Sequence, residues 1–179
     1  MKKIIVFSFL LISTILVAQE KLVSKSGKIT LVASVPAFEE IKATNNGVTV
    51  VLNSKTGEIA SLALLKGFRF KIALMEEHFN ENYVESDKYP KATFKGKIEN
   101  FDVATLSASA KDFTLKGKME IHGITKDILI PAKIRKVDNG IEVVANFSIL
   151  ASDYNIQIPS IVKNKVSNKI NLKLDALFK

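Results

Sequence analysis

The sequence predicts an all-β protein of about eight antiparallel strands, with one short helix between strands. Apolar and polar residues alternate with period two over most of the chain, and glycine-containing turn signals separate many of the alternating runs. One stretch, residues 73–83, has helical spacing instead. Eight strands that are each half apolar cannot lie in one flat sheet without exposing edges and an apolar face. We therefore expect a closed barrel or a sandwich.

The N-terminus predicts a secretory signal peptide. Two lysines precede an apolar run over residues 4–18, which is too short for a comfortable membrane span. We expect a signal peptide at 1–18 and one mature domain at 19–179, placed in the periplasm or secreted. An uncleaved membrane anchor is the alternative.

The chain is basic, with a net charge of +8 and no cysteine. It therefore contains neither disulfides nor a cysteine for lipid attachment. A basic exported protein can contact anionic membrane surfaces transiently. Nucleic acid is not an expected partner, because the lysines are spread along the chain and tryptophan is absent.

Each alternating run has one apolar face. Charged residues such as Lys95, Lys97, Lys116 and Lys118 occupy the intervening positions, so one face is expected to be buried and the other wet. Taken at every second residue, the apolar faces lie in residues 29–35, 48–52, 60–64, 68–72, 94–98, 113–121, 128–134, 141–149 and 170–178.

Turn signals that end in glycine lie between several of these runs. They occur at residues 26–27, 45–47, 55–57, 122–123 and 138–140.

Small residues on the inward faces allow two interpretations. They leave volume for a lumen in an eight-stranded barrel, or they interdigitate with larger residues into a solid core. The residues alone leave both open. The small inward residues are Ala33, Ala60, Gly96, Gly117, Ala132, Ala145 and Ala176.

Residues 76–90, EEHFNENYVESDKYP, interrupt the alternation with a histidine among five acids and two tyrosines. We interpret residues 73–83 as a helical lid beside the barrel mouth. Leu74, Met75 and Phe79 are expected to face the barrel, with His78 as a hinge or headgroup contact. The residues expected to face water are Glu76, Glu77, Glu81 and Glu85.

Neither catalysis nor metal binding is expected, so the protein is predicted not to be an enzyme. His78 and Glu81 supply two metal ligands at most, whereas zinc sites need three or four. His122 belongs to a different element and is expected to bond backbone atoms in a tight turn. An outer-membrane barrel is disfavoured, because such barrels carry aromatic belts and this chain has no tryptophan and three tyrosines.

Three ordered motifs resemble the YceI-like family of lipid- or polyisoprenoid-binding proteins. They are His78 followed by Tyr89-Pro90 and Phe94, then IHGITK at residues 121–126, then DYNI at residues 153–156. The resemblance covers most of the mature chain. It implies a lipocalin-like, eight-stranded barrel whose apolar lumen holds an amphiphile.

The expected function is thus an exported carrier or scavenger of an isoprenoid, quinone or fatty-acid tail, with no cofactor other than the bound lipid. A stress or interaction module that uses its outer surface without a lipid is the alternative. The candidate ligand-binding residues are Leu31, Phe68, Phe70, Leu74, Met75, His78, Phe79, Phe94, Met119, Ile121, Phe147 and Leu172.

Overall fold

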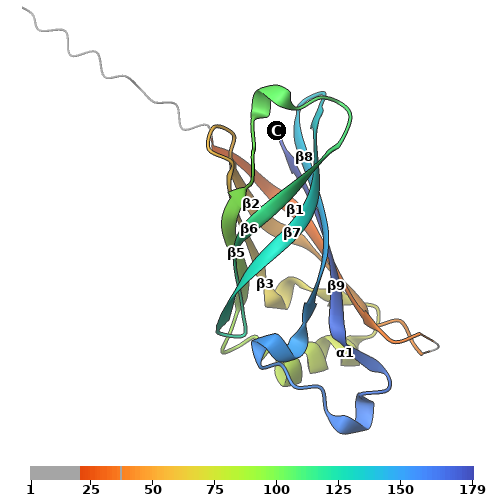
Figure 1. Cartoon of the computed structure of the whole chain (residues 1–179). Helices are drawn as coiled ribbons and strands as arrows, with labels where there is room; N and C mark the ends of the chain where they lie inside the picture. The colour runs from red at the N-terminus through yellow and green to blue at the C-terminus, as the bar shows by residue number, and fades with distance from the viewer. Residues whose placement is uncertain (1–20, 37) are drawn as a thin grey trace, which may run out of the picture.

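Figure 1 shows the computed structural model, which describes residues 21–36 and 38–179. The predicted signal peptide, residues 1–18, lies outside the described residues. Within them, the strands are β1 (Lys21–Ser34), β2 (Lys42–Asn53), β3 (Glu58–Leu64), β4 (Arg69–Phe70), β5 (Lys91–Ile98), β6 (Lys111–Ile121), β7 (Ile124–Val137), β8 (Gly140–Leu150) and β9 (Val166–Phe178).

In the described chain, eight strands close into an antiparallel barrel, which confirms the predicted fold class. Neighbouring strands follow the order β1-β9-β8-β7-β6-β5-β3-β2, and β2 pairs back onto β1. Closure leaves no open edge among these strands. The short β4 adds to β2 through the pairs Ala43–Phe70 and Thr44–Arg69. No helix in residues 21–36 or 38–179 is long and apolar enough to cross a membrane.

The turn predictions are confirmed for only some of the glycine signals. The β6–β7 turn has positive φ at both His122 (51°) and Gly123 (74°), a geometry that matches the twist of a two-residue hairpin. The signals at 55–57, 122–123 and 138–140 connect consecutive strands, whereas those at 26–27 and 45–47 lie inside β1 and β2.

Gly27 shows why a glycine inside a strand resembles a turn signal. The β1–β2 register shifts on both sides of Gly27. A Cβ atom there would lie 2.8 Å from the carbonyl oxygen of Val48, so a side chain does not fit without displacement. The glycine therefore marks an irregular ladder and a close backbone approach rather than a chain reversal.

The upper half of the barrel in Figure 1 is a solid core. The β5–β6 loop, residues 99–110, folds over this end, where Leu106 is buried and the rings of Phe101 and Phe113 lie 6.1 Å apart. Side chains buried in this way are typical of a packed interior rather than of an open lumen. Among the buried side chains of this half are Leu52, Ile98, Leu115, Ile134, Val143 and Phe178.

The paired glycines of β5 and β6 bring the two strands close together. Gly96 and Gly117 are register partners, and a Cβ atom on Gly117 would lie 2.3 Å from the carbonyl oxygen of Lys95. A Cβ atom on Gly96 would lie 2.8 Å from the ring of Phe94. The ring of Phe94 therefore occupies the space that the missing Gly96 side chain leaves, and this glycine does not enlarge a lumen.

The orientation predicted for β3 is wrong. Ala60, Leu62 and Leu64 were expected inside, but Leu62 and Leu64 are exposed, while Ile59 and Ala63 are buried. Both faces of this strand carry apolar residues, so the alternation alone does not identify the inner face. Burial is decided by the pairing of β3 with β2 and β5.

The predicted helix is present between β4 and β5. It begins as α1 (Ala73–His78) and continues as a π-helix, η2 (Phe79–Tyr83). The amide of Val84 donates to the carbonyl oxygen of Phe79 at 3.0 Å, a hydrogen bond across five residues. We call residues 73–89 the lid.

The π turn changes which residue follows Met75 and Phe79 on the barrel side of the lid. At 3.6 residues per turn, a continuous α-helix would bring Asn82 onto that side. The wider turn brings Tyr83 there instead, and Asn82 is exposed.

Candidate ligand-binding site

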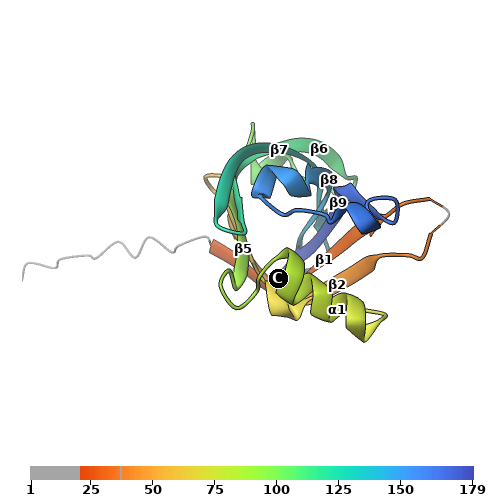
Figure 2. The ribbon, with the colours of Figure 1, turned by 90° about the horizontal axis from the view of Figure 1, so that it is seen from below.

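A cavity of about 470 Å³ lies in the half of the barrel that is lower in Figure 1, and the lid lies at this end. Figure 2 views this end, where α1 lies along one side and the β8–β9 connection, residues 151–165, lies across it. The innermost lining residues are two register pairs, Phe94–Met119 and Ile29–Leu174. They form the floor of the cavity, because the inward residues beyond them belong to the solid core.

Most of the predicted ligand-binding residues line this one cavity. They come from β1, the β3–β5 connection, β5, β6, β8 and β9, so barrel closure brings together residues that are far apart in sequence. Their contacts with a ligand stay a prediction. The predicted residues that line the cavity are Leu31, Phe68, Phe70, Met75, His78, Phe79, Phe94, Met119, Ile121, Phe147 and Leu172.

Leu74 is the exception. Its side chain is 55% exposed and does not line the cavity, so its predicted position is wrong. Met75 and Phe79, one turn apart, face the barrel, and Leu74 lies about 100° around the helix axis from Met75. Helical spacing alone did not decide whether Leu74 faces the barrel or the solvent.

The β8–β9 connection supplies lining residues that the sequence analysis missed. Ile156, Ile158 and Val162 lie in a segment of short turns without period-two or helical spacing. No local pattern therefore identified them. Other missed lining residues, such as Ile149 and Ile170, were on predicted inward faces, and an estimate of the cavity depth would have found them.

Aromatic contacts attach the lid to the barrel. The ring of Phe79 lies 5.6 Å from that of Phe68 and 5.2 Å from that of Phe70. Tilted and edge-to-face arrangements of this kind are favourable beyond the area they bury. The apolar side of the lid therefore packs against β4 and the residue just before it.

Glu76 contributes to the same attachment. Its carboxylate accepts a hydrogen bond from Arg69 Nη1 at 2.8 Å and another from the backbone amide of Phe70 at 3.1 Å. The expectation that Glu76 faces water is therefore wrong. Glu76 thus supplies the hydrogen-bond acceptor for the Phe70 amide, at the end of β4.

A second attachment is formed by His122, in the β6–β7 turn. Its Nδ1 lies 3.0 Å from the carbonyl oxygen of Tyr154, and its Nε2 lies 2.6 Å from Glu85 Oε2. Tyr89 packs edge-on against the imidazole, with centroids 4.5 Å apart. The expected backbone bond is present, and the carboxylate partner was not foreseen. We call His122, Glu85, Tyr89 and Tyr154 the His122 clamp.

The clamp joins the lid to the β8–β9 connection. Nδ1 donates to the Tyr154 carbonyl oxygen, because a carbonyl oxygen can only accept, and Nε2 pairs with the Glu85 carboxyl group. Glu85 and His122 both have positive φ, 45° and 51°. Non-glycine residues rarely adopt this conformation, so the clamp is built on two unusual backbone positions. Burial, with a smaller contribution from the Asp153 carboxylate, raises the pKa of Tyr154, which keeps its phenol neutral.

The chemistry of the cavity is that of a hydrophobic container. Its lining is mostly apolar, with Ser61, His78 and Tyr83 among the few polar side chains and Glu39 and Lys165 from its loops. Within the described ranges, no cluster of three or more His, Cys, Asp or Glu residues is placed to hold a metal ion. A lining of this kind can remove the apolar surface of a small molecule from water, while a few polar groups fix the orientation of that molecule.

Several solved structures have the same fold. A polyisoprenoid-binding domain from Saccharophagus degradans matches with a TM-score of 0.76 at 14% identity, over 90% of this chain and 98% of that one. Burkholderia cenocepacia BcnA matches with a TM-score of 0.71 at 13% identity, over 84% and 95% of the two chains. A Campylobacter jejuni YceI protein matches with a TM-score of 0.61 at 18% identity, over 81% and 89%.

Among curated proteins, no sequence matches this chain. The family model for the YceI-like domain, in contrast, matches residues 17–178. This match spans nearly the whole sequence and agrees with the barrel topology and the shared fold. The chain belongs to the YceI-like family.

Proposed function

We propose that this protein is an exported carrier or scavenger that holds the tail of an amphiphile in its barrel cavity. The single observation that carries the proposal is the apolar cavity of about 470 Å³ beneath the lid. The similarity to a polyisoprenoid-binding domain supports a prenyl chain as the tail. A quinone's isoprenoid tail and a fatty acid are further candidates, because an apolar lining accepts any such chain. The protein acts by binding, without catalysis.

Burial of the tail supplies sufficient free energy for this function. Each methylene group moved from water to an apolar site contributes about 0.8 kcal/mol. Ten buried carbons therefore contribute roughly 8 kcal/mol before the costs of association. No charged contact is needed, which agrees with a lining that is mostly apolar.

An organic extract of the protein, purified without detergent, tests the proposal. We expect mass spectrometry to detect a co-purified amphiphile in near-stoichiometric amount. The stripped protein should then bind the fluorescent probe N-phenyl-1-naphthylamine and release it when palmitate is added. An empty extract together with no probe binding would favour the alternative of an interaction module without a lipid.

Export is part of the proposal, since a carrier of membrane-derived tails would work beyond the inner membrane. Its support is the sequence of residues 1–18, with two lysines before a short apolar run.

Transient membrane contact would let the carrier collect its ligand. Ile161, in the short helix η5 (Ser160–Val162) of the β8–β9 connection, is 85% exposed, and Lys163 and Lys165 follow it in the chain. Phe38, in the β1–β2 loop, also lines the cavity and is partly exposed. An exposed apolar residue beside lysines is suited to an anionic lipid surface.

We expect Ile161→Ser to weaken sedimentation with anionic vesicles about tenfold, because one isoleucine side chain no longer enters the interface. Leu129→Ser is the matched control, since Leu129 is 62% exposed on β7, opposite Lys116 and away from the lid. Equal losses for the two variants would contradict contact through this end.

A further inference from the structure

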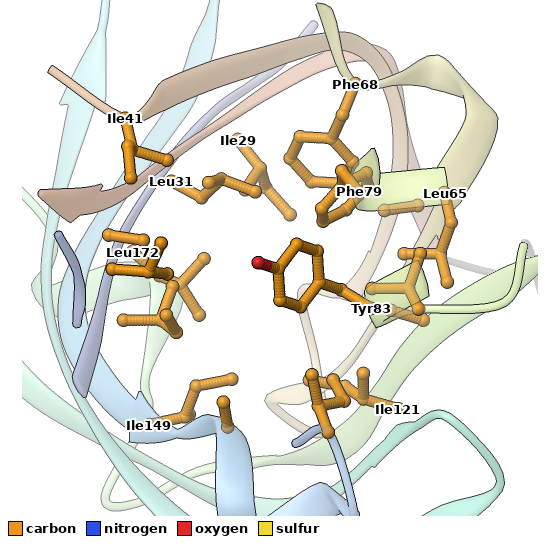
Figure 3. Close-up of a pocket in the computed structure, with 18 of the residues that line it drawn as sticks. Ile29, Leu31, Ile41, Leu65, Phe68, Phe79, Tyr83, Ile121, Ile149 and Leu172 are labelled. Atoms are coloured by element: carbon orange, nitrogen blue, oxygen red, sulfur yellow. The ribbon is translucent and has the colours of Figure 1, made fainter. Parts of the chain in front are cut away.

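Tyr83 extends from the lid into the cavity. Figure 3 shows its ring reaching toward the middle of the pocket, with the hydroxyl oxygen pointing between Leu31 and Leu172. The π-helix η2 favours this direction, because its wide turn keeps Tyr83 on the same side of the lid as both Met75 and Phe79. A π turn within a helix occurs frequently at functional sites.

The hydroxyl group has no partner among the described residues, since none of their hydrogen bonds involves it. Its labelled neighbours in Figure 3, such as Ile29, Leu65 and Ile149, offer only carbon atoms. The buried polar atoms without a partner among the described residues are Ser24 Oγ and Asn80 Oδ1, so the Tyr83 hydroxyl is open to water in the cavity. A tail that displaces this water leaves the donor unsatisfied unless the ligand itself carries an acceptor. Packing alone does not need the oxygen, because Phe79 and Phe94 fill neighbouring parts of the same cavity without one.

We infer that the Tyr83 hydroxyl donates a hydrogen bond to an acceptor atom of the bound amphiphile, such as a carbonyl or ether oxygen, inside the cavity. This inference rests on the proposed function and narrows its ligand class. Burial of apolar surface holds the tail. The Tyr83 hydroxyl favours ligands whose acceptor atom lies level with it in the cavity. Pure hydrocarbons of the same length lack this contact.

Three probes of equal chain length test the inference, namely pentadecane, pentadecan-2-one and pentadecan-8-one. Each displaces N-phenyl-1-naphthylamine from wild type, from Tyr83→Phe and from Tyr89→Phe. Tyr89→Phe is the matched control, because Tyr89 belongs to the same lid but does not line the cavity. The two ketones place the acceptor at different depths.

We expect Tyr83→Phe to weaken at least one ketone about fivefold, the change produced by loss of one neutral hydrogen bond. Pentadecane should bind equally to all three proteins, and the melting temperature of ligand-free Tyr83→Phe should not fall. Unchanged ketone binding, an equal loss for ketones and alkane, or a lower melting temperature would each overturn the inference. Failure of wild type to bind any probe would instead overturn the proposed function, and the inference with it.

Discussion

Phe94→Asp is expected to lower the free energy of unfolding by about 3–5 kcal/mol, the scale of an uncompensated buried charge. Phe94 is 4% exposed and forms the cavity floor with Met119, its register partner. Its ring also covers Gly96. A carboxylate there removes both contacts and must be buried or protonated. Because small domains are stable by only about 5–15 kcal/mol, much of this protein is expected to be insoluble or unfolded.

Urea unfolding measures this effect, with Lys95→Asp as the matched control. Lys95 is the next residue, points outward and lies opposite Lys118 on β6. Replacing one of two opposed lysines removes a like-charge contact, so the control should keep its stability within about 0.5 kcal/mol. Equal urea midpoints for wild type and Phe94→Asp would show that Phe94 does not face the interior.

His122→Asn is expected to lower the free energy of unfolding by about 2 kcal/mol, the scale of hydrogen bonds that involve a charged group. Asparagine tolerates the positive φ of 51° at this position, so the backbone of the turn is preserved. The variant loses the contacts to Glu85 and to the Tyr154 carbonyl oxygen. The lid and the β8–β9 connection are then no longer joined through the imidazole.

Two measurements distinguish loosening of the lid in His122→Asn from destabilisation of the whole barrel. Thermal unfolding should show the destabilisation, and hydrogen exchange should accelerate in residues 73–89 more than in the solid core. His78→Asn is the control, because the His78 side chain is exposed and forms no hydrogen bond to another described residue. Similar exchange profiles for the two histidine variants would contradict the role given to the His122 clamp.

Period-two alternation predicted about eight half-buried strands, since one apolar face recurs in nearly every strand, but it left a barrel and a sandwich open, and the family resemblance selected the barrel. The alternation failed at β3, where Ile59, Ala60, Leu62 and Ala63 are apolar on both faces. There the neighbouring strands, and not the strand's own sequence, select the buried side. The turn predicted at residues 26–27 was wrong for a related reason. Glycine is favoured both in turns and where two strands approach closely, so Gly27 alone does not distinguish the two.

The lid shows a different limit. The extent of its helical part, residues 73–83, followed from helical spacing, but the π turn depends on backbone hydrogen bonds that spacing does not encode. Tyr83 was therefore missed, and Leu74 was placed on the wrong side. The pairing of His122 with Glu85 joins residues 37 positions apart, and neither local sequence signals the other. Small inward residues left a lumen and a solid core both open, and the barrel contains both: Ala33 lines the cavity, whereas Ala132, Ala145 and Ala176 belong to the solid core.

The closed floor formed by Phe94 and Met119 has a kinetic consequence. A chain that enters beneath the lid cannot leave through the opposite end, because the barrel beyond the floor is filled. In the proposed carrier, the tail would therefore enter first and leave last, and a second molecule could not push the first one through. Exchange between two membranes is then limited by dissociation, so its rate should not depend on the concentration of the incoming ligand.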